Sequence, residues 1–469
     1  MHKARLLTVA LLIGSAASSA ASFAQSSPAP ASGAASPILL PPPPEVSDAM
    51  LTPVPPPKRL LSSWQEALTL LRARSTDLRI ALDQVLQAEA QTRLALSGYL
   101  PTITANGSYT HQLLTKNVVI VPIPGLTAST EVPAPNVFNG SVQLQQALLN
   151  VSQFDQIGIS ELNEAASRLS FEDRKRTLAL SLANQIVAVV TAERGAEINR
   201  GGLRVALEQL EIAKRKQALG AANGLDVVRA DQNAANARAA LVSGDESLRE
   251  AREALGLALG IPEETGVASD VNIDGLAKTA VDSCRAVESV SDRPDVASAQ
   301  TSLDVAKRNL RNVWFTFLPT ITLQSTLSAT SLPANSYPNP TWNVQGLLSI
   351  PIWDGGTRYG NLKNGRAAED IAAQNLEALR RQAIIQVEQA RRGVIVAETS
   401  NRVAREQRDL AAQNDQMTQT AYMAGQGTSL ELVTASEAHR QAELNLALQD
   451  FNVVKARILA VLALATCPW

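Results

Sequence analysis

The sequence predicts a mainly α-helical fold with a membrane β-barrel part, built as two copies of one helix–strand–strand–long helix–return helix repeat. Three observations lead to this prediction. Two stretches of more than 100 residues contain no proline, as long helices require, because an interior proline costs about 3 kcal/mol. Four short segments alternate apolar and polar residues with the period of a strand. Finally, one series of motifs occurs twice in the 469 residues.

The first 24 residues have the pattern of an export signal peptide. Lys3 and Arg5 precede an apolar run at 6–13, and a small-residue stretch then ends in Ser22-Phe23-Ala24, after which we expect cleavage. The alternative is a membrane anchor, but a spanning helix needs about 20 apolar residues and this run is shorter. No later run of 18 apolar residues exists, so we expect no transmembrane helix in the mature chain.

Residues 25–57 form a proline-rich segment. Positions 28–57 hold 11 of the 24 prolines of the chain. This composition is typical of an extended or disordered arm, so we expect residues 25–57 to be a disordered arm outside the packed part of the molecule.

The internal repeat is visible in three motifs that recur in the same order. Leu100-Pro101-Thr102-Ile103-Thr104 returns 218 residues later at 318–322. Phe138 matches Trp342 at an offset of 204, and the turn from Gly220 to Asp226 matches the turn from Gly425 to Glu431 at an offset of 205. A loop that is 14 residues longer in the first copy accounts for almost all of the difference.

These matches divide the mature chain into two structural repeats and a connection. We expect the first repeat at 58–261, an inter-repeat linker near the middle of the helical part at 262–292, and the second repeat with the C-terminal end at 293–469. Expected strands lie at about 101–115, 137–148, 319–331 and 341–351. Expected long helices lie at about 151–219 and 355–424, and at 1.5 Å per residue each spans roughly 105 Å.

The four expected strands are long enough to cross a membrane at a tilt but too few to close a barrel, which takes about eight. Aromatic residues gather around them, because 11 of the 17 lie in 99–154 and 314–359. The alternative is a soluble sheet capped by aromatic side chains. The export signal and the long helices favour a barrel shared between subunits. We expect membrane-surface belts made by Tyr99, Tyr109, Phe138, Trp314, Phe315, Phe317, Trp342 and Trp353.

The alternation also assigns the two faces of the expected sheet. One face is polar and should line water, and the other is apolar and should contact lipid. The polar set includes Asn106, Ser141, Gln324 and Gln345, and the apolar set includes Val142, Leu323 and Val344.

The duplicated pattern, the Leu-Pro-x-Ile-x strand starts and the Gly-x-x-x-x-Leu-[Asp/Glu]-x-Val-x-Ala turns resemble the TolC-like outer-membrane efflux proteins over about residues 60–466. The resemblance implies a homotrimer whose four strands per subunit form a twelve-stranded β-barrel in the lipid of the outer membrane of a Gram-negative bacterium. It also implies a trimeric α-helical barrel that extends into the periplasm. Such a channel would receive substrates from a periplasmic adaptor protein and an inner-membrane pump.

The resemblance places the periplasmic entrance at the helix turns, with Gly220, Gly425, Tyr422, Asp226 and Glu431. It assigns an acidic selectivity ring to Glu431, whereas Asp226 would support the turn. Both carboxylates also follow a capping pattern, so each can instead serve as a helix cap. The sequence departs from the family pattern where Gly427 replaces a basic residue of the entrance latch and Thr434 replaces a second acidic residue.

The two cysteines, Cys284 and Cys467, lie in the linker and after the last helix. The repeat offset puts both near one level of the helical part, and an oxidising periplasm permits a disulfide between them. The alternative, two separate thiols, remains open at this point.

Other functional classes find little support in the sequence. The net charge of −2 argues against nucleic-acid binding, and three distant His with two Cys exclude a Cys/His zinc cluster. No catalytic triad or cofactor motif is present, and the Gly355-Gly356 pair lacks the Lys-Ser/Thr ending of a phosphate loop. We therefore expect no enzyme, no catalytic residue, no metal and no cofactor. The alternative to a channel is a periplasmic coiled-coil scaffold or adaptor.

Overall fold

The computed structural model describes residues 44–111, 113, 118–119, 129–130, 136–268, 275, 278–279, 282–331 and 340–469. The predicted signal peptide and residues 25–43 of the arm lie outside the described residues. The chain divides into two compact units, Met1–Pro43 and Pro44–Trp469, and all that follows concerns the second unit.

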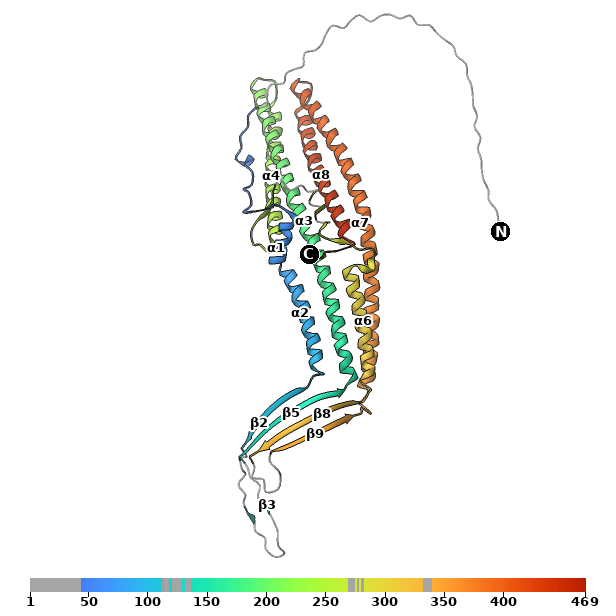
Figure 1. Cartoon of the computed structure of the whole chain (residues 1–469). Coiled ribbons are helices and arrows are strands. Elements are labelled where there is room, and N and C mark those ends of the chain that lie inside the picture. Colours follow the sequence, from blue (N-terminus) through green and yellow to red (C-terminus); the bar gives the residue numbers. More distant parts are fainter. Residues whose placement is uncertain are drawn as a thin grey trace, which may run out of the picture. The chain divides into compact units, whose positions relative to one another are not determined.

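Long helices make up most of this unit (Figure 1). The chain forms α1 (Trp64–Arg74), α2 (Thr76–Ser97), α3 (Val151–Ala218), α4 (Gly224–Ala258), α6 (Pro294–Phe315), α7 (Thr357–Met423) and α8 (Ser429–Leu462). The two long helices end within two residues of the predicted positions, so that prediction is confirmed. Helix α3 packs against α2, α4, α6 and α8, whereas α7 packs against α6 and α8. Among the described residues, none of the helices has the length and apolar character needed to cross a membrane.

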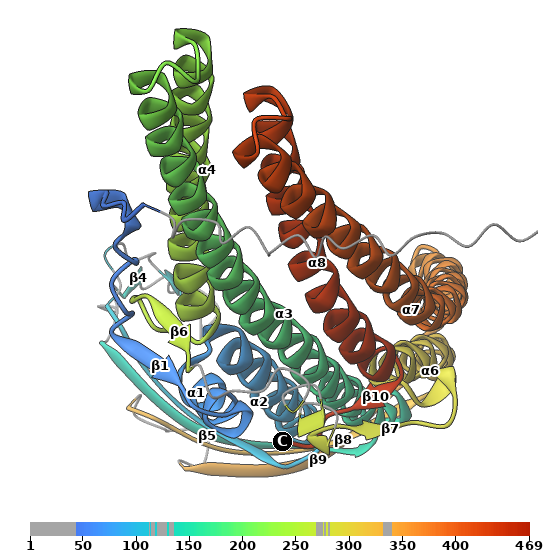
Figure 2. The same ribbon diagram turned by 90° about the horizontal axis from the view of Figure 1, so that it is seen from above.

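Four antiparallel strands form one sheet in the order β2-β5-β8-β9, and the view from above shows this sheet as an arc (Figure 2). They are β2 (Thr102–Thr110), β5 (Val137–Leu149), β8 (Thr320–Thr330) and β9 (Thr341–Ser349). Two short strands, β3 (Val118–Val119) and β4 (Ser129–Thr130), pair within the β2–β5 connection. The predicted first strand, 101–115, is too long, because its partner begins only at Val137, opposite Thr110. Beyond that pair, His111 Nδ1 meets Asn136 Oδ1 at 2.6 Å instead.

The main core lies where the shorter helices meet beside α3. Buried apolar side chains from α1, α3, α4 and α8 pack together there, including Leu71, Leu182, Leu255 and Ile458. Full burial of each such side chain contributes roughly 1.5–3 kcal/mol. Two small sheets border this core: β1 (Arg59–Leu61) pairs with β6 (Thr265–Val267), and β7 (Arg285–Ala286) pairs with β10 (Ala465–Thr466).

The C-terminal end of α8 is tied to the linker in this core. The Sγ atoms of Cys284 and Cys467 are bonded as a disulfide. Two buried arginines donate to the last carbonyls of α8, Arg176 to Leu462 O at 3.3 Å and Arg293 to Ala463 O at 3.4 Å. These contacts satisfy carbonyls that a helix end leaves without a partner. They bring the first repeat, the linker and the second repeat together at one point.

Residues 44–57 are ordered, so the predicted disordered arm is wrong for this part of the chain. The segment, here called the N-terminal strap (Pro44–Pro57), runs along α3 and α4 and includes the 3-10 turn η1 (Ala49–Leu51). Asp48 pairs with Arg238 at 3.1 Å, and Arg252 donates to Pro55 O at 3.1 Å. Apolar strap residues placed between the prolines cover a second buried cluster of α3 and α4, which is the physical reason for the order; they are Val46, Met50 and Leu51.

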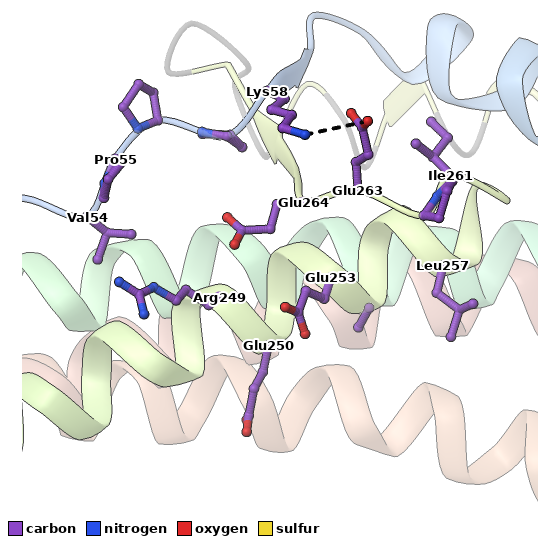
Figure 3. A pocket seen from close by; sticks show the side chains of 14 residues that line it. Val54, Pro55, Lys58, Arg249, Glu250, Glu253, Leu257, Ile261, Glu263 and Glu264 are labelled. Atoms are coloured by element: carbon purple, nitrogen blue, oxygen red, sulfur yellow. Dashed lines mark ion pairs between the residues drawn. The ribbon is translucent and has the colours of Figure 1, made fainter.

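The strap leaves a cavity of about 850 Å³ against α4 and the loop that follows it. Figure 3 shows the carboxylates of Glu253 and Glu264 projecting into this space. The Lys58 Nζ–Glu263 Oε1 ion pair, at 3.7 Å, closes one side. The strap is thus held at intervals rather than along its whole length.

Candidate functional site

The two helix turns that connect α3 to α4 and α7 to α8 are built in the same way. Gly220 has φ of 73° and Gly425 has φ of 76°, the left-handed backbone that favours glycine. The backbone amide of the residue after each glycine donates to a carbonyl in the last turn of the preceding long helix. Ala221 N donates to Lys216 O at 2.8 Å, and Gln426 N donates to Ala421 O at 2.9 Å. Both glycines therefore end a long helix and let the chain reverse.

Each return helix begins with a capping box. In α4, Asn223 Oδ1 accepts from Asp226 N at 3.0 Å, and Asp226 Oδ2 accepts from Asn223 N at 3.2 Å. In α8, Thr428 and Glu431 make the same reciprocal pair. The backbone amide and hydroxyl of Thr428 both donate to Glu431 Oε2, and they hold the pKa of this exposed carboxyl below its ordinary value of 4.5. Both carboxylates are caps, as the sequence allowed, and Glu431 stays exposed to solvent.

Asp226 does more than cap its own helix. The hydroxyl of Ser429, at the start of α8, donates to Asp226 Oδ1. The first and second helical hairpins are therefore joined at their tips by a hydrogen bond between residues 203 positions apart in sequence.

Lys216 makes the second link between the tips. Its Nζ lies 2.6 Å from Tyr422 O and 3.8 Å from the centre of the Tyr422 ring. Burial lowers the pKa of Lys216, an effect that the nearby Asp226 charge partly offsets. Burial, followed by the Asp226 charge, raises the pKa of Tyr422. The cluster of Lys216, Asp226, Tyr422 and Ser429, here called the tip cluster, thus holds a cation against a phenol ring and an anion that accepts from a hydroxyl.

The structure brings four of the five predicted entrance residues to this place: the two glycines, Tyr422 and Asp226. Glu431 contacts only its own hairpin among the described hydrogen bonds and ion pairs. Lys216 and Ser429 were missed from the sequence. Lys216 supplies, from the first hairpin, a cation at the end of α7, where it donates to Tyr422 O. A side chain at Gly427 would crowd the end of α7, since an added Cβ would lie 3.1 Å from Tyr422 N.

At the opposite end of α3 and α7, the sheet has one apolar and one polar face. Cross-strand pairing places Val142 beside Leu327 and Ser325 beside Val344, on the side of Leu323. On the other side, Gln145 pairs with Gln324 and Gln324 with Gln345, whose amide donates across the pair at 3.0 Å. Asn106 pairs with Ser141 on that same side. The register therefore separates the two sets of residues named from the sequence, while their contact with water or lipid stays a prediction.

Aromatic side chains occur at both ends of the strands. Tyr109 and Phe138 pair across β2 and β5 at the far end, with ring centres 6.1 Å apart. Trp342 is the second residue of β9, which begins at that end, and it pairs with Leu327 of β8. Tyr99, Trp314, Phe315, Phe317 and Trp353 lie where the strands join the helices. The strand from Thr102 to Tyr109 spans about 24 Å at 3.4 Å per residue, close to the ~25 Å apolar band of outer-membrane barrels. Phe154 and Tyr359, missed from the sequence, add ring contacts to Tyr99 and Phe317.

Other candidate chemistry is not supported by the described part of the chain. Among those residues, no group of three or more His, Cys, Asp and Glu could hold a metal ion. Gly355 and Gly356 form the turn from β9 into α7, where Asp354 Oδ1 accepts from Gly356 N at 3.1 Å. This turn is a strand-to-helix connection.

Comparison with known proteins now decides the family. The sequence pattern described as "Outer membrane efflux protein" matches residues 67–261 and 287–463, more than half of the chain. The chain belongs to the outer membrane efflux protein family. Its two matched segments correspond to the two repeats and omit most of the linker.

Individual members of the outer membrane efflux protein family are distant in sequence. The pyoverdine export outer membrane protein OpmQ of Pseudomonas aeruginosa is 24% identical over 66% of this chain and 65% of its own length, slightly less than two thirds. The cation efflux system protein CusC of Escherichia coli is 24% identical over 79% of this chain and 80% of its own. The crystal structure of the Campylobacter jejuni CmeC outer membrane channel has a TM-score of 0.71 at 16% identity and covers 91% of this chain and 94% of that one. The fold of this chain is therefore the fold of these channels.

Proposed function

We propose that this protein is the outer-membrane channel of a tripartite efflux or secretion system. It would conduct substrates passively to the exterior from a periplasmic adaptor and an inner-membrane pump, and would catalyse no reaction. Family membership supports this proposal, and relatives are named for export or efflux. The pyoverdine and cation named for two of them differ, so the family by itself selects no single cargo.

One observation carries the proposal: the apolar-faced sheet and the tip cluster stand at opposite ends of α3 and α7 (Figure 1). Helices of 68 and 67 residues separate these ends by roughly 100 Å. A sheet in the outer membrane would then leave the tips far inside the periplasm, where a pump complex can reach them.

The proposal requires several copies of the chain. Four strands cannot enclose a path, whereas three copies supply twelve. In such a trimer the tips of three copies meet around one axis and form the entrance. Export to this location needs a signal, and we assign that role to residues 1–24, with cleavage after Ala24.

Fractionation and capture test this proposal together. The full-length protein should require detergent, sediment with outer membranes and co-purify with an adaptor and a pump after mild cross-linking. A protein found free in the periplasmic extract, without detergent, would instead support the scaffold or adaptor alternative.

A further inference from the structure

The polar face of the sheet carries no charged side chain. Among the residues of β2, β5, β8 and β9, as the structure describes them, none is Asp, Glu, Lys, Arg or His. The first charged residues after β5 and β9 are already paired, Asp155 with Arg308 at 2.8 Å and Asp354 with Arg358 at 2.8 Å. A solute beside this face therefore meets amides and hydroxyls but no fixed charge.

Three glutamines share one row of the polar face near the helix end of the strands. Cross-strand pairing joins Gln145 to Gln324 and Gln324 to Gln345, and these three residues are here called the amide row. The next two rows toward the far end hold two amides and one amide; in order, they are Thr104–Gln143–Thr326–Asn343 and Asn106–Ser141–Ser328–Thr341. On the helix side, Thr322 pairs with Ala147 and Leu347, so these pairs contain no amide. Long polar side chains are therefore most numerous at the amide row.

The side chains of the amide row are linked to one another but not covered. Gln345 Nε2 donates to Gln324 Oε1 at 3.0 Å, which holds these two side chains side by side. Gln145 and Gln345 are exposed, and Gln324 is half-buried between them. A glutamine amide has two donor hydrogens and an oxygen with two acceptor positions. One bond between two of the three amides leaves most of this capacity available to water or to a solute.

The length of inward side chains decides the bore of a barrel of the size that three copies would make. About eight strands leave an interior that side chains just fill, whereas about 16–18 strands leave an aqueous channel. Twelve strands fall between these limits, so long side chains narrow the path. We propose that the amide rows of three copies form an uncharged constriction at the helix end of the strand segment, which selects cargo by size and hydrogen bonding. This inference rests on the proposed function, because several copies are needed to enclose the path.

The constriction would be a band of amides rather than a flat ring. Strands of outer-membrane barrels tilt by about 35–45°, so the row of each copy runs obliquely around the path. Pore diameter and the hydrogen-bonding groups that line a pore are general determinants of selectivity. Amides can exchange hydrogen bonds with the hydroxyl and amide groups of a cargo and favour neither sign of charge. The cation preference expected from Glu431 would then arise outside the strand segment.

Cysteines on either side of Gln324 test the constriction from the exterior. Thr322→Cys places a thiol on the helix side and Thr326→Cys on the far side, about 14 Å apart along β8 at 3.4 Å per residue. Intact cells that make the full-length protein would be treated with maleimide-linked polyethylene glycols of graded size. The largest reagent that labels Thr326→Cys would then be applied to Thr322→Cys. The protein without an added cysteine gives the background from Cys284 and Cys467.

We expect this reagent to label Thr322→Cys much more slowly than Thr326→Cys. Replacing all three glutamines of the amide row by serine should make the two rates equal. Asn106→Ser is the matched control, because it removes an amide from a row that has only one, and it should leave Thr322→Cys protected. If the triple serine variant forms no trimer, Gln345→Ser alone should give partial loss of protection.

Two further measurements separate size, hydrogen bonding and charge. Replacing the three glutamines by methionine keeps the side-chain length, so it should keep the size limit but slow small hydrophilic maleimides, since an apolar constriction sheds water. In purified trimers, cationic and anionic methanethiosulfonates of similar size should give the same ratio of rates at Thr322→Cys as at Thr326→Cys. Different ratios would overturn the uncharged character of the constriction.

Equal labelling of Thr322→Cys and Thr326→Cys by the large reagent, with all three glutamines present, would overturn the constriction while leaving the channel proposal intact. Protection that is lost in Asn106→Ser as fully as in the serine variants would also overturn its assignment to the amide row. If no reagent labels Thr326→Cys in folded protein, the polar face does not line a path open to water. That result would instead contradict the proposed function itself.

Discussion

Ser429 donates its hydroxyl hydrogen to Asp226 Oδ1 and so joins the first turn of α8 to the first turn of α4. Asp226 is also the acidic partner of the α4 capping box. One carboxylate therefore fixes a helix start and the distance between two hairpin tips. Glu431, the equivalent residue of the second repeat, has only the first of these roles.

We predict that Ser429→Ala loosens the tips without unfolding the return helices. The variant removes one hydrogen bond to a charged group, worth about 1.5–3 kcal/mol, but leaves both capping boxes intact. Amide exchange should become faster around 216–226 and 420–431, and channels should open to a larger mean conductance. Thr434→Ala is the matched control, because its hydroxyl bonds only within α8. Equal changes in both variants would show that the Asp226–Ser429 bond does not hold the tips.

We predict that Glu431→Gln weakens cation preference with little change in trimer stability. Gln keeps most of the capping geometry while removing the exposed charge that three copies would present to a narrow mouth. Reversal potentials in a salt gradient measure the effect, and block by multivalent cations should weaken in parallel. Unchanged selectivity would leave Glu431 as a helix cap alone.

The lowered pKa of Glu431 gives this site a definite pH dependence. Because the folded pKa lies below the ordinary value of 4.5, the stabilisation from the cap is fully present above that value. It is lost as the pH falls through the lower, folded pKa. Cation preference should therefore stay constant from neutral pH down to about 4.5 and fall only below it. A decline well above that pH would mean that other groups determine selectivity.

We predict opposite tolerance of the two sheet faces to a charge. Leu323→Arg puts a cation on the apolar face, where it costs about 2–4 kcal/mol near the membrane midplane. The neighbouring Gln324→Arg puts the same side chain on the polar face and should mainly alter conductance. The readouts are the amount of trimer in the outer membrane and the single-channel current. Normal insertion of Leu323→Arg with failure of Gln324→Arg would reverse the assignment of the faces.

We predict that Cys284 and Cys467 are bonded in the exported protein. The bond closes a loop with a sequence separation of 183, which includes all but the last two residues of the second repeat. Replacing both cysteines by serine should lower stability by about 2–4 kcal/mol. Alkylation without a reducing agent followed by mass spectrometry gives the direct test. Two labelled thiols would show that the bond does not form.

Much of this fold could be predicted from the sequence because the chain is a repeat. Proline-free stretches give α3 and α7 almost to the residue, and the period-two segments give all four main strands. The offsets between Thr102 and Thr320 and between Phe138 and Trp342 even reproduce a strand register. Local periodicity is sufficient here because each element repeats one pattern over many residues.

The features that were missed depend on contacts that local pattern does not record. The proline-rich composition of the strap predicts disorder, yet Asp48 accepts a hydrogen bond from Arg238, 190 positions away in the sequence. Lys216 was missed because its counterpart in the second repeat is Ala421, so comparison of the repeats gave no signal. Ser429 likewise corresponds to Gly224. At the tip cluster the two repeats carry different residues at equivalent positions. Only the folded chain shows that Lys216 and Ser429, one from each repeat, belong to the same cluster.

Single-channel recording of the purified protein in a planar lipid bilayer tests most directly whether copies of this chain enclose a conducting path. We expect discrete, uniform current steps that favour cations and that shift when Ser429 or Glu431 is replaced. Folded trimers that insert into the bilayer and carry no current in any of these forms would contradict it.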